Sequence, residues 1–517
     1  MDAETIYRRR WATLVVLSLS LVIIGLDNTI LNVALPTLVR ELGATASQLQ
    51  WMVDAYVLVF AGLLLTMGAL GDRFGRKLAL NIGLVLFGLS SIAAAFADSA
   101  NTLIAARAVM GIGGALIMPS TLSIITNTFE GQERGRAIAA WAAVAGLGII
   151  LGPVLGGWLL ENFWWGSIFL INVIVVIVAI GAGAVLVPES KDPDATPLDP
   201  QGAVLSIAGL VTLVYAIIEA PSRGWTDPLI LAAFGLAAVF ITVFLWWETK
   251  SPHPMLRLSF FENPRFSAAS VAITLVFFAM FGTIFMLTQY LQFVLGFSPL
   301  EAGFRVMPIA TMIVAAPLSA RFTERFGTKR VVTTGLVIVA VAMSILASIT
   351  VDSGYGQVAL ALAVLGAGMG TAMAPATDSI MGSLPLAKAG VGSAMNDTTR
   401  MIGGALGVAI LGSILASSYA SAMAPVVSLL PPAAAEVAGD SVGGAAAVAA
   451  QLGAAAAPLM DAAGAAYIGG MQIAVWVAAG VALLGAVVTG LFLPARPLEM
   501  TASGSVADGD QQDFVME

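Results

Sequence analysis

The stretch GDRFGRK, Gly71 to Lys77, separates two long apolar runs and indicates how the chain is built. Its pattern returns in the second half of the chain as TERFGTK, Thr323 to Lys329. A second pair follows in the same order, because GIGGALIMPSTLSII, Gly111 to Ile125, aligns with AGMGTAMAPATDSIM, Ala367 to Met381, with a proline at the same place in each. Two matches in one order indicate a parallel internal duplication.

The composition is that of a chain embedded in lipid. Hydrophobic residues make up 59% of the 517 residues and charged residues only 10%, whereas about a quarter of a soluble domain is charged. The chain has no cysteine and a single histidine, His253, so disulfides and most metal sites are excluded, and we expect no metal and no cofactor. The net charge of −8 argues against a nucleic-acid partner, which needs a basic surface to bind.

Apolar runs long enough to cross about 30 Å of hydrocarbon recur along the whole chain. We therefore expect an all-α polytopic membrane protein with about fourteen transmembrane helices. The predicted spans are 12–36, 51–70, 78–97, 102–125, 137–160, 164–187, 202–220, 228–247, 267–294, 303–320, 331–350, 357–381, 398–420 and 470–493.

The basic residues predict the orientation of these spans. If both termini face the cytoplasm, nearly all of the 23 lysines and arginines lie in cytoplasmic segments, and only Arg40 and Arg223 lie outside. This bias follows the positive-inside rule. The alanine-rich composition is typical of a high-GC bacterium, so we expect the bacterial cytoplasmic membrane with both termini inside.

The duplication divides the chain into two bundles of six helices. We expect the first bundle in residues 1–190, a linker region with two extra transmembrane helices in 191–262, and the second bundle in 263–495. An extracellular loop at 421–469 should carry short surface helices, with a disordered loop as the alternative, and 496–517 should be an acidic cytoplasmic tail. Two bundles facing each other across a central cavity are the plan of a transporter with its site near the bilayer midplane.

The first span contains a carboxylate, Asp27, within LVIIGLDNTILNVALP. Such a group costs roughly 2.5–3.5 kcal/mol at the centre of a helix in lipid, so we expect it to have a function. A carboxyl group that is neutral when dry and charged when hydrated or paired is suited to carry a proton. Arg107 in the fourth span needs acceptors and is expected to bond to this carboxylate. The alternatives are a purely structural ion pair, or an arginine that reaches to the outer interface. Asp54 in the second span is a further proton-carrier candidate, with a helix cap as its alternative.

Polar and aromatic residues near this carboxylate predict a cavity. Asn28 and Asn32 lie one helical turn apart, so their side chains share a face that should point into the protein. Phe277, Phe281 and Phe285 of the ninth span are candidates for an apolar cavity wall, and the alternative is that they face lipid.

Four stretches together resemble the major facilitator superfamily. GALGDRFGRK, Gly68 to Lys77, looks like the family's loop between spans 2 and 3, and LIAARAVMGIGGA, Leu103 to Ala115, looks like its fourth-span arginine motif. GLGIILGPVLGG, Gly146 to Gly157, looks like the antiporter signature of span 5. GLDNTILNVALP, Gly25 to Pro36, resembles the first-span motif of the fourteen-helix drug:proton antiporters, which include quaternary-ammonium exporters. The resemblance covers nearly the whole chain and implies the major facilitator fold, with proton carriage by Asp27 and Asp54.

The loop after the second span is expected to be a gate. Its glycines permit a tight cytoplasmic turn, and on residues alone it is equally a positive-inside loop. The resemblance implies a latch that holds the inner end of the bundle shut, formed by Gly68, Gly71, Asp72, Arg73, Gly75, Arg76 and Lys77.

The fifth span carries a ridge of small residues. Gly148, Gly152 and Gly156 recur every four residues, which lets another helix approach closely in lipid. Pro153 can kink the helix beside them, and Gly157 completes the motif. The alternative is plain helix packing, whereas the resemblance implies a ridge that prevents leakage and marks exchange.

We therefore expect a proton-coupled antiporter that exports amphipathic organic compounds by alternating access. Its partners would be small amphipathic substrates, protons and the lipid bilayer, and it would act as a monomer. The alternatives are a dedicated exporter of an endogenous metabolite, antibiotic or lipid, and a receptor or scaffold that does not transport. No catalytic constellation is recognisable, so an enzyme is not expected. No acidic residue is expected well inside spans 10 and 13, where organic-cation exporters of this family often carry them.

Overall fold

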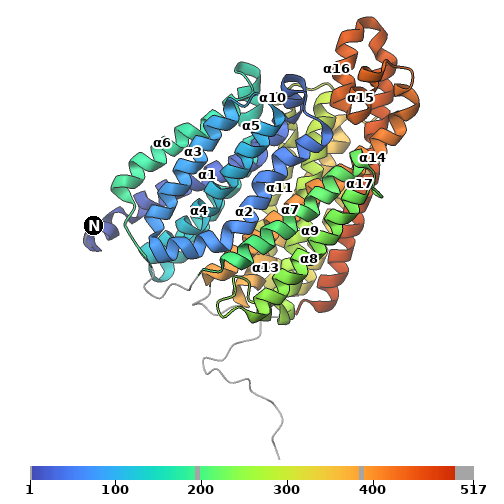
Figure 1. Cartoon of the computed structure of the whole chain (residues 1–517). Helices are drawn as coiled ribbons and strands as arrows, with labels where there is room; N and C mark the ends of the chain where they lie inside the picture. The colour runs from blue at the N-terminus through green and yellow to red at the C-terminus, as the bar shows by residue number, and fades with distance from the viewer. Residues whose placement is uncertain (1–2, 192–197, 384–388, 495–517) are drawn as a thin grey trace, which may run out of the picture.

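The computed structural model describes residues 3–191, 198–383 and 389–494, and within these ranges every regular element is a helix (Figure 1). The elements are α1 (Ala3–Leu42), α2 (Ala46–Phe74), α3 (Arg76–Ala95), α4 (Ala100–Thr128), α5 (Gly131–Asn162), α6 (Ser167–Leu186), α7 (Pro200–Arg223), α8 (Pro228–Lys250), η1 (Leu258–Glu262), α9 (Pro264–Gln289), η2 (Tyr290–Val294), α10 (Pro299–Val306), η3 (Met307–Ala310), α11 (Thr311–Phe326), α12 (Thr328–Ala347), α13 (Tyr355–Gly382), α14 (Ala389–Val427), α15 (Pro432–Asp440), α16 (Val442–Leu452), η5 (Gly453–Ala456) and α17 (Ala457–Phe492). The expected tail at 496–517 lies outside the described residues.

Among the described residues, 13 helical segments are long and apolar enough to cross a membrane. The remaining predicted span, 137–160, lies within α5, which is 32 residues long. The tenth span differs from the prediction, because Pro308 lies in a short 3-10 turn that divides it into α10 and α11. The spans otherwise fall where the apolar runs predict them, since lipid requires every backbone group to be bonded within its own helix.

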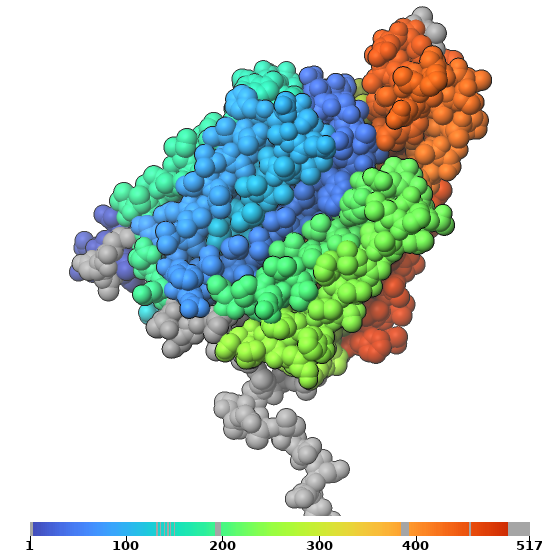
Figure 2. Space-filling view, viewed as in Figure 1, coloured from blue at the N-terminus to red at the C-terminus, as the bar shows by residue number. Residues whose placement is uncertain are grey.

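Two ends of the molecule can be distinguished. The N-terminus and the turn between α2 and α3 lie at one end, which we call the basic end. Helices α15 and α16 project from the opposite end, which we call the hairpin end (Figures 1 and 2). The predicted loop at 421–469 is mostly helical, because α14 continues to Val427 and α17 begins at Ala457. The short helices expected there are α15 and α16.

The two repeated loops fold alike. Helix α2 ends at Gly75, whose φ is 126°, and α11 ends at Gly327, whose φ is 82°. In each case the next helix begins at the following residue. Gly71, which was also expected to permit the turn, instead lies inside α2, where a Cβ would be 3.2 Å from the Ala79 Cβ. It therefore allows close packing and does not shape the turn.

We call the helices of residues 3–191 the first group and the helices of residues 264–494 the second group. Helix α7 bridges these two groups along one seam. Gly62 of α2 packs against Ile207 of α7, and the Trp51 indole donates a hydrogen bond to Glu219 of α7 at 3.2 Å. On its other side, α7 accepts a hydrogen bond at the Ile217 carbonyl from Ser413 of α14, at 2.7 Å. Helix α8 packs on α7 and leaves most of its surface exposed, as Figure 2 shows for this pair. The two extra helices therefore cover one seam and do not enter the centre.

Hydrogen bonds between the two groups occur only toward the hairpin end, among the described residues of 3–191 and 264–494. They join Glu161 to Leu300, Val33 to Gln292, Ala46 to Asp440, and Gln50 to Ser413. Close backbone contacts of Gly157 with Leu300 and of Gly303 with Pro153 lie at the same end. The two groups are thus joined at the hairpin end.

Substituting Gly327 by Ala tests the turn. Its backbone, with φ 82° and ψ 155°, lies in a region that side chains rarely adopt, so Gly327→Ala should destabilise the protein by about 1–3 kcal/mol. The measurement is thermal unfolding in detergent. Gly480→Ala is the matched control, because a Cβ at Gly480 meets nothing within 4 Å. Equal melting temperatures for the two variants would contradict this account.

Candidate functional site

Asp27 lies deep inside α1 and is fully buried. Helix α1 continues to Leu42, so Asp27 is about 22 Å from that end at 1.5 Å per residue, deeper than the shorter predicted span implies. Arg107 of α4 donates a hydrogen bond from Nη1 to Asp27 Oδ2, and from Nε to the Met52 carbonyl at 2.9 Å. Its guanidinium carbon also lies 4.5 Å from the centre of the Tyr56 ring. The expected pairing of Asp27 with Arg107 is therefore present.

A third helix contributes to this site. Asn172 of α6 donates a hydrogen bond from Nδ2 to Asp27 Oδ1 at 3.3 Å, and it is also buried. Asn172 was not recognised from the sequence, although it is the one amide in α6, whose other residues after Ser167 are all apolar. A lone amide in such a helix is a usable signal, since polar side chains in lipid seek partners within the protein.

The environment of Arg107 decides between its alternatives. With only 1% of its surface exposed, Arg107 does not reach the interface, so the snorkelling alternative is wrong. A guanidinium keeps its proton, so the charge of Asp27 must balance it here. Protonation of Asp27 would leave Arg107 without its counter-ion, which is costly in a buried site. Asp27 is therefore the counter-ion of Arg107 in this buried site.

Asp54 of α2 is fully buried, and neither carboxylate oxygen has a hydrogen-bond partner among the described residues. The cap of α2 is Thr45, so the alternative of a helix-capping Asp54 is wrong. Gln50, one turn earlier on the same helix face, packs against Gly412 of α14. Asp54 therefore lies toward the second group of helices, on a different face from the contact between Tyr56 and Arg107.

The predicted cavity residues are all buried, so the lipid-facing alternative for the three phenylalanines is wrong. The rings of Phe277 and Phe281 stack with their centroids 5.9 Å apart. Phe285 lines a cavity near the hairpin end. The Asn28 and Asn32 amides donate to carbonyls one turn earlier, and both Oδ1 atoms are buried without a partner among the described residues.

One acidic residue was missed in the second group. Helix α14 begins at Ala389, earlier than predicted, so Asp397 lies two turns inside it and is 5% exposed. Asp397 Oδ1 is 3.4 Å from Arg400 Nη1, and the Arg400 guanidinium carbon lies 5.6 Å from the Phe277 ring centre. Asp397 thus lies one residue before the predicted span 398–420, near the start of α14, and was not singled out from the sequence.

The glycine ridge of α5 packs against the helix that carries Asp27. A Cβ on Gly148, Gly152 or Gly156 would lie 3.0–3.2 Å from the carbonyl oxygen of α1 residues Val22, Leu26 and Ile30 respectively. These contacts extend on both sides of Asp27 along α1. Pro153 and Gly157 instead face α10, through Gly303 and Leu300. The motif therefore holds α5 against both α1 and the second group.

The Asp72 loop makes its contacts within the first group. Asp72 accepts a hydrogen bond from Arg76 at 2.7 Å, and the Arg76 backbone N–H donates to the Ser190 carbonyl at 2.9 Å. Lys77 donates to the Ala184 carbonyl at 3.1 Å, whereas Arg73 is exposed. Gly68 lies inside α2, where a Cβ would be 3.3 Å from the Pro119 side chain. The expected latch across the basic end is not formed in this conformation by the described residues.

Comparison with known proteins agrees with this architecture. The family model described as the Major Facilitator Superfamily matches residues 17–408. The multidrug efflux pump LfrA of Mycolicibacterium smegmatis is 39% identical over 93% of this chain and 96% of its own length. The tetracenomycin C resistance and export protein of Streptomyces glaucescens is 32% identical over 95% of this chain and 93% of its own. The methyl viologen resistance protein SmvA of Salmonella typhimurium is 36% identical over 80% and 84%.

Solved structures share the fold at low identity. A bacterial homolog of the human lysosomal transporter Spinster, in an inward-facing and unoccupied conformation, aligns with a TM-score of 0.66 at 19% identity, over 94% of this chain and 98% of its own. The inward-open xylose transporter XylE from E. coli aligns with a TM-score of 0.54 at 14% identity, over 94% and 96%. The chain is thus a multi-pass membrane protein. It belongs to the major facilitator superfamily, as its motifs predict.

Enlarging one ridge glycine tests how α5 positions Asp27. Gly148→Leu should push α1 away from α5 and lower both stability and activity, because a Cβ added at this position would lie only 3.0 Å from the Val22 carbonyl oxygen. Gly146→Leu is the matched control on the same helix, since a Cβ at Gly146 meets nothing within 4 Å. The measurements are melting temperature and drug resistance of expressing cells. Equal loss in both variants would contradict a specific role for the ridge.

Removing one charge of the buried pair tests its energetics. Asp27→Asn should destabilise the protein by about 3–5 kcal/mol, because Arg107 is left without a counter-ion. The double variant Asp27→Asn, Arg107→Gln should regain most of this stability without regaining transport. Thermal unfolding of the purified variants measures the first effect. An additive double variant would mean that the two side chains do not interact.

Proposed function

We propose that this protein exports drugs and other amphipathic organic compounds across the bacterial cytoplasmic membrane in exchange for protons. The observation that carries the proposal is the buried Asp27–Arg107 pair, completed by Asn172 from a third helix. A membrane helix bears the cost of such a charge chiefly where it has a function. The relatives named as efflux, export and resistance proteins support the direction of transport and the class of substrate.

The orientation follows from the distribution of charge. The N-terminal arginines and the turn that contains Asp72 lie at the basic end, which the positive-inside rule assigns to the cytoplasm. The hairpin end then faces outward. Because the hydrogen bonds between the groups lie toward the hairpin end, we assign this conformation to the state that is closed to the outside.

During the transport cycle, the negative charge on the Asp27 and Asp54 carboxylates is balanced by different partners in turn. In the inward-open state, Asp27 is ionised and held by Arg107, while substrate enters from the cytoplasm toward the wall of Phe277 and Phe281. Rocking of the two groups opens the hairpin end, and a proton from outside then reaches the carboxylates as substrate leaves. Return of the empty, protonated carrier releases the proton inside. Each proton brings about 2.3 kcal/mol per 100 mV of membrane potential.

The glycine ridge of α5 and the Asp72 loop have separate roles in this cycle. The glycine ridge of α5 keeps α1 packed and prevents leakage as the groups move. The Asp72 loop governs closure of the cytoplasmic end, where its Asp72–Arg76 pair holds the turn until the second group approaches. In this proposal Asp27 and Asp54 carry the proton, and the site needs no metal or cofactor. Because a single chain supplies all of these residues, we propose that the protein acts as a monomer.

A second candidate function uses the same machinery for one endogenous product. The relative named for both resistance to and export of tetracenomycin C favours it. The two functions differ in breadth, because a dedicated exporter would protect cells from one compound and its close analogues only.

A drug and dye susceptibility panel tests the proposal. Cells expressing the wild type should resist several unrelated amphipathic compounds, whereas Asp27→Asn should reduce resistance to that of cells without the transporter, because the proton carrier is lost. Asp54→Asn should reduce it as well if the two carboxylates share the proton. Asp352→Asn is the control, since this carboxylate is exposed in a turn. Wild-type resistance in Asp27→Asn would contradict proton carriage by Asp27.

A further inference from the structure

Two buried carboxylates face each other between the ends of the extra helices α7 and α8. Asp199 is the N-cap of α7 and Glu248 lies in the last turn of α8, with 8% and 4% of their surfaces exposed. A Cβ added at Gly202 of α7 would lie 2.6 Å from Glu248 Oε1 and 2.8 Å from Asp199 Oδ2. The two oxygens therefore converge on the same side of one glycine.

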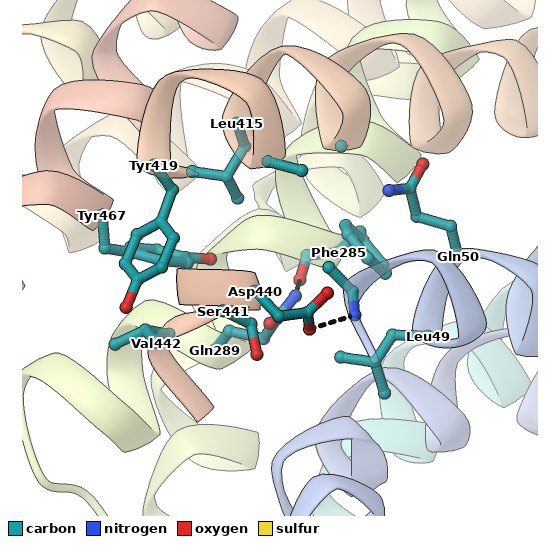
Figure 3. Close-up of a pocket in the computed structure, with 13 residues that line it drawn as sticks. Leu49, Gln50, Phe285, Gln289, Leu415, Tyr419, Asp440, Ser441, Val442 and Tyr467 are labelled. Carbon is teal, nitrogen blue, oxygen red and sulfur yellow. Dashed lines mark hydrogen bonds between the residues drawn. The ribbon is translucent and has the colours of Figure 1, made fainter. Parts of the chain in front are cut away.

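This pair of carboxylates lies at the basic end (Figure 1). The segment that follows α8 is held there by the Thr66 hydroxyl of α2, which donates a hydrogen bond to the Met255 sulfur at 3.2 Å, two turns before Asp72. The cavity lined by Phe285 lies beneath the α15–α16 hairpin instead (Figure 3), and its lining includes neither carboxylate. The pair is therefore a separate feature of the fold.

Asp199 is held by N–H donors on both of its oxygens. Its Oδ1 accepts hydrogen bonds from the Gly202 backbone N–H and from the Trp247 indole, each at 2.9 Å. The same indole nitrogen lies 3.1 Å from Oδ2. An ionised carboxylate can only accept, so this set of donors suits Asp199 as a carboxylate.

Glu248 has a different environment. Its Oε2 accepts a hydrogen bond from the Leu256 backbone N–H at 2.9 Å, whereas Oε1 is buried and has no partner among the described residues. Asp199 is the one charged group that acts on Glu248 in this part of the chain. The basic residues that follow, Lys250 and His253, are exposed, and neither pairs with Glu248. Two like charges would thus be buried together without a counter-ion, which is costly.

A proton on Glu248 satisfies every one of these atoms. A protonated carboxyl group has one O–H donor and one carbonyl acceptor. Because Oε2 already accepts from Leu256, the O–H belongs on Oε1, which is the oxygen that faces Asp199 Oδ2. The pair then carries one negative charge, as two carboxyl groups in one site do when they share a proton.

We propose that Asp199 and Glu248 form a second proton-binding site, in which a proton from the cytoplasm is held on Glu248 Oε1 and faces the Asp199 carboxylate. The step balances, because a hydronium ion or buffer acid on the cytoplasmic side loses the proton that forms the O–H bond on Glu248. Its release is the reverse. The inference goes beyond the proposed exchange, since it involves neither Asp27 nor a transported compound.

This proton holds together the ends of helices that connect the two groups. Glu248 bonds to Leu256 in the segment that leads to α9 of the second group, while Asp199 begins α7, which bridges both groups. Loss of the proton leaves two buried negative charges side by side. The stability that the site contributes is therefore present at low pH and is lost as the pH rises and the proton leaves. A rise in cytoplasmic pH thus loosens α7 from the segment after α8.

Two substitutions at one position separate proton binding from packing. Glu248→Gln keeps an oxygen that can accept from the Leu256 N–H and replaces the O–H by an amide donor, so it imitates the protonated form at every pH. Glu248→Met removes both the donor and the acceptor. Glu262→Gln is the matched control, because Glu262 is an exposed carboxylate of η1, a short way along the same segment.

The measurements are infrared difference spectra and melting temperatures of the purified full-length protein in detergent, across a series of pH values. Glu248→Gln should lose a carbonyl band of a protonated carboxyl group that titrates in the wild type. Its melting temperature should fall less with rising pH and exceed that of the wild type at the alkaline end by at least about 2 °C. Glu248→Met should melt lower at every pH, and Glu262→Gln should match the wild type.

An unchanged carboxyl band and a wild-type pH profile in Glu248→Gln would overturn the inference. It would also be overturned if Na⁺, K⁺ or Mg²⁺ raised the melting temperature of the wild type but not of Glu248→Gln, since a metal ion would then occupy the site. The band should persist in Asp27→Asn. A failure of the proposed transport function would therefore be distinguishable from a failure of this inference.

Discussion

The contact between Asp27 and Arg107 is the constraint on which the rest of the first bundle depends. Two opposite charges in a buried site are stable only while they remain together and their other polar atoms are bonded. That condition fixes α1 against α4 through Arg107 and against α6 through Asn172. The glycine ridge of α5 supports this arrangement, because it packs closely against α1 on both sides of Asp27.

The two bundles are joined by few directional contacts. Their hydrogen bonds lie toward the hairpin end, among the described residues, and two of them involve the first turns of α2. A small number of polar contacts between otherwise rigid bundles is the arrangement expected of groups that rock against each other, because few bonds must break at once. The extra helices α7 and α8 cover one seam of this interface. Helix α7 bonds to the rim of both bundles, and α8 lies farther out.

The polar contacts that join the helices come from distant parts of the chain. Asp27, Arg107 and Asn172 come from three helices, and Asp440 comes from a hairpin far along the sequence. The hairpin belongs by sequence to the second bundle, yet it bonds to the start of α2 in the first. The hairpin therefore contacts both bundles at the hairpin end, although it belongs by sequence to one of them.

The sequence by itself predicted the membrane spans, an internal duplication and the pairing of Asp27 with Arg107. Lipid imposes an apolar run of fixed length on every span, and a buried arginine must have an acceptor, so both are properties of local composition. Gly75 was likewise expected from the sequence to permit the turn after α2, where its φ is 126°. The sequence placed the start of α14 too late, and so missed Asp397, because a helix that extends beyond the lipid is not limited to an apolar run. Only the tertiary structure could place Asn172 on Asp27, Gln50 above Asp54, and Asp440 at the first turn of α2. Such contacts depend on how distant helices pack, and no short-range pattern in the chain records that.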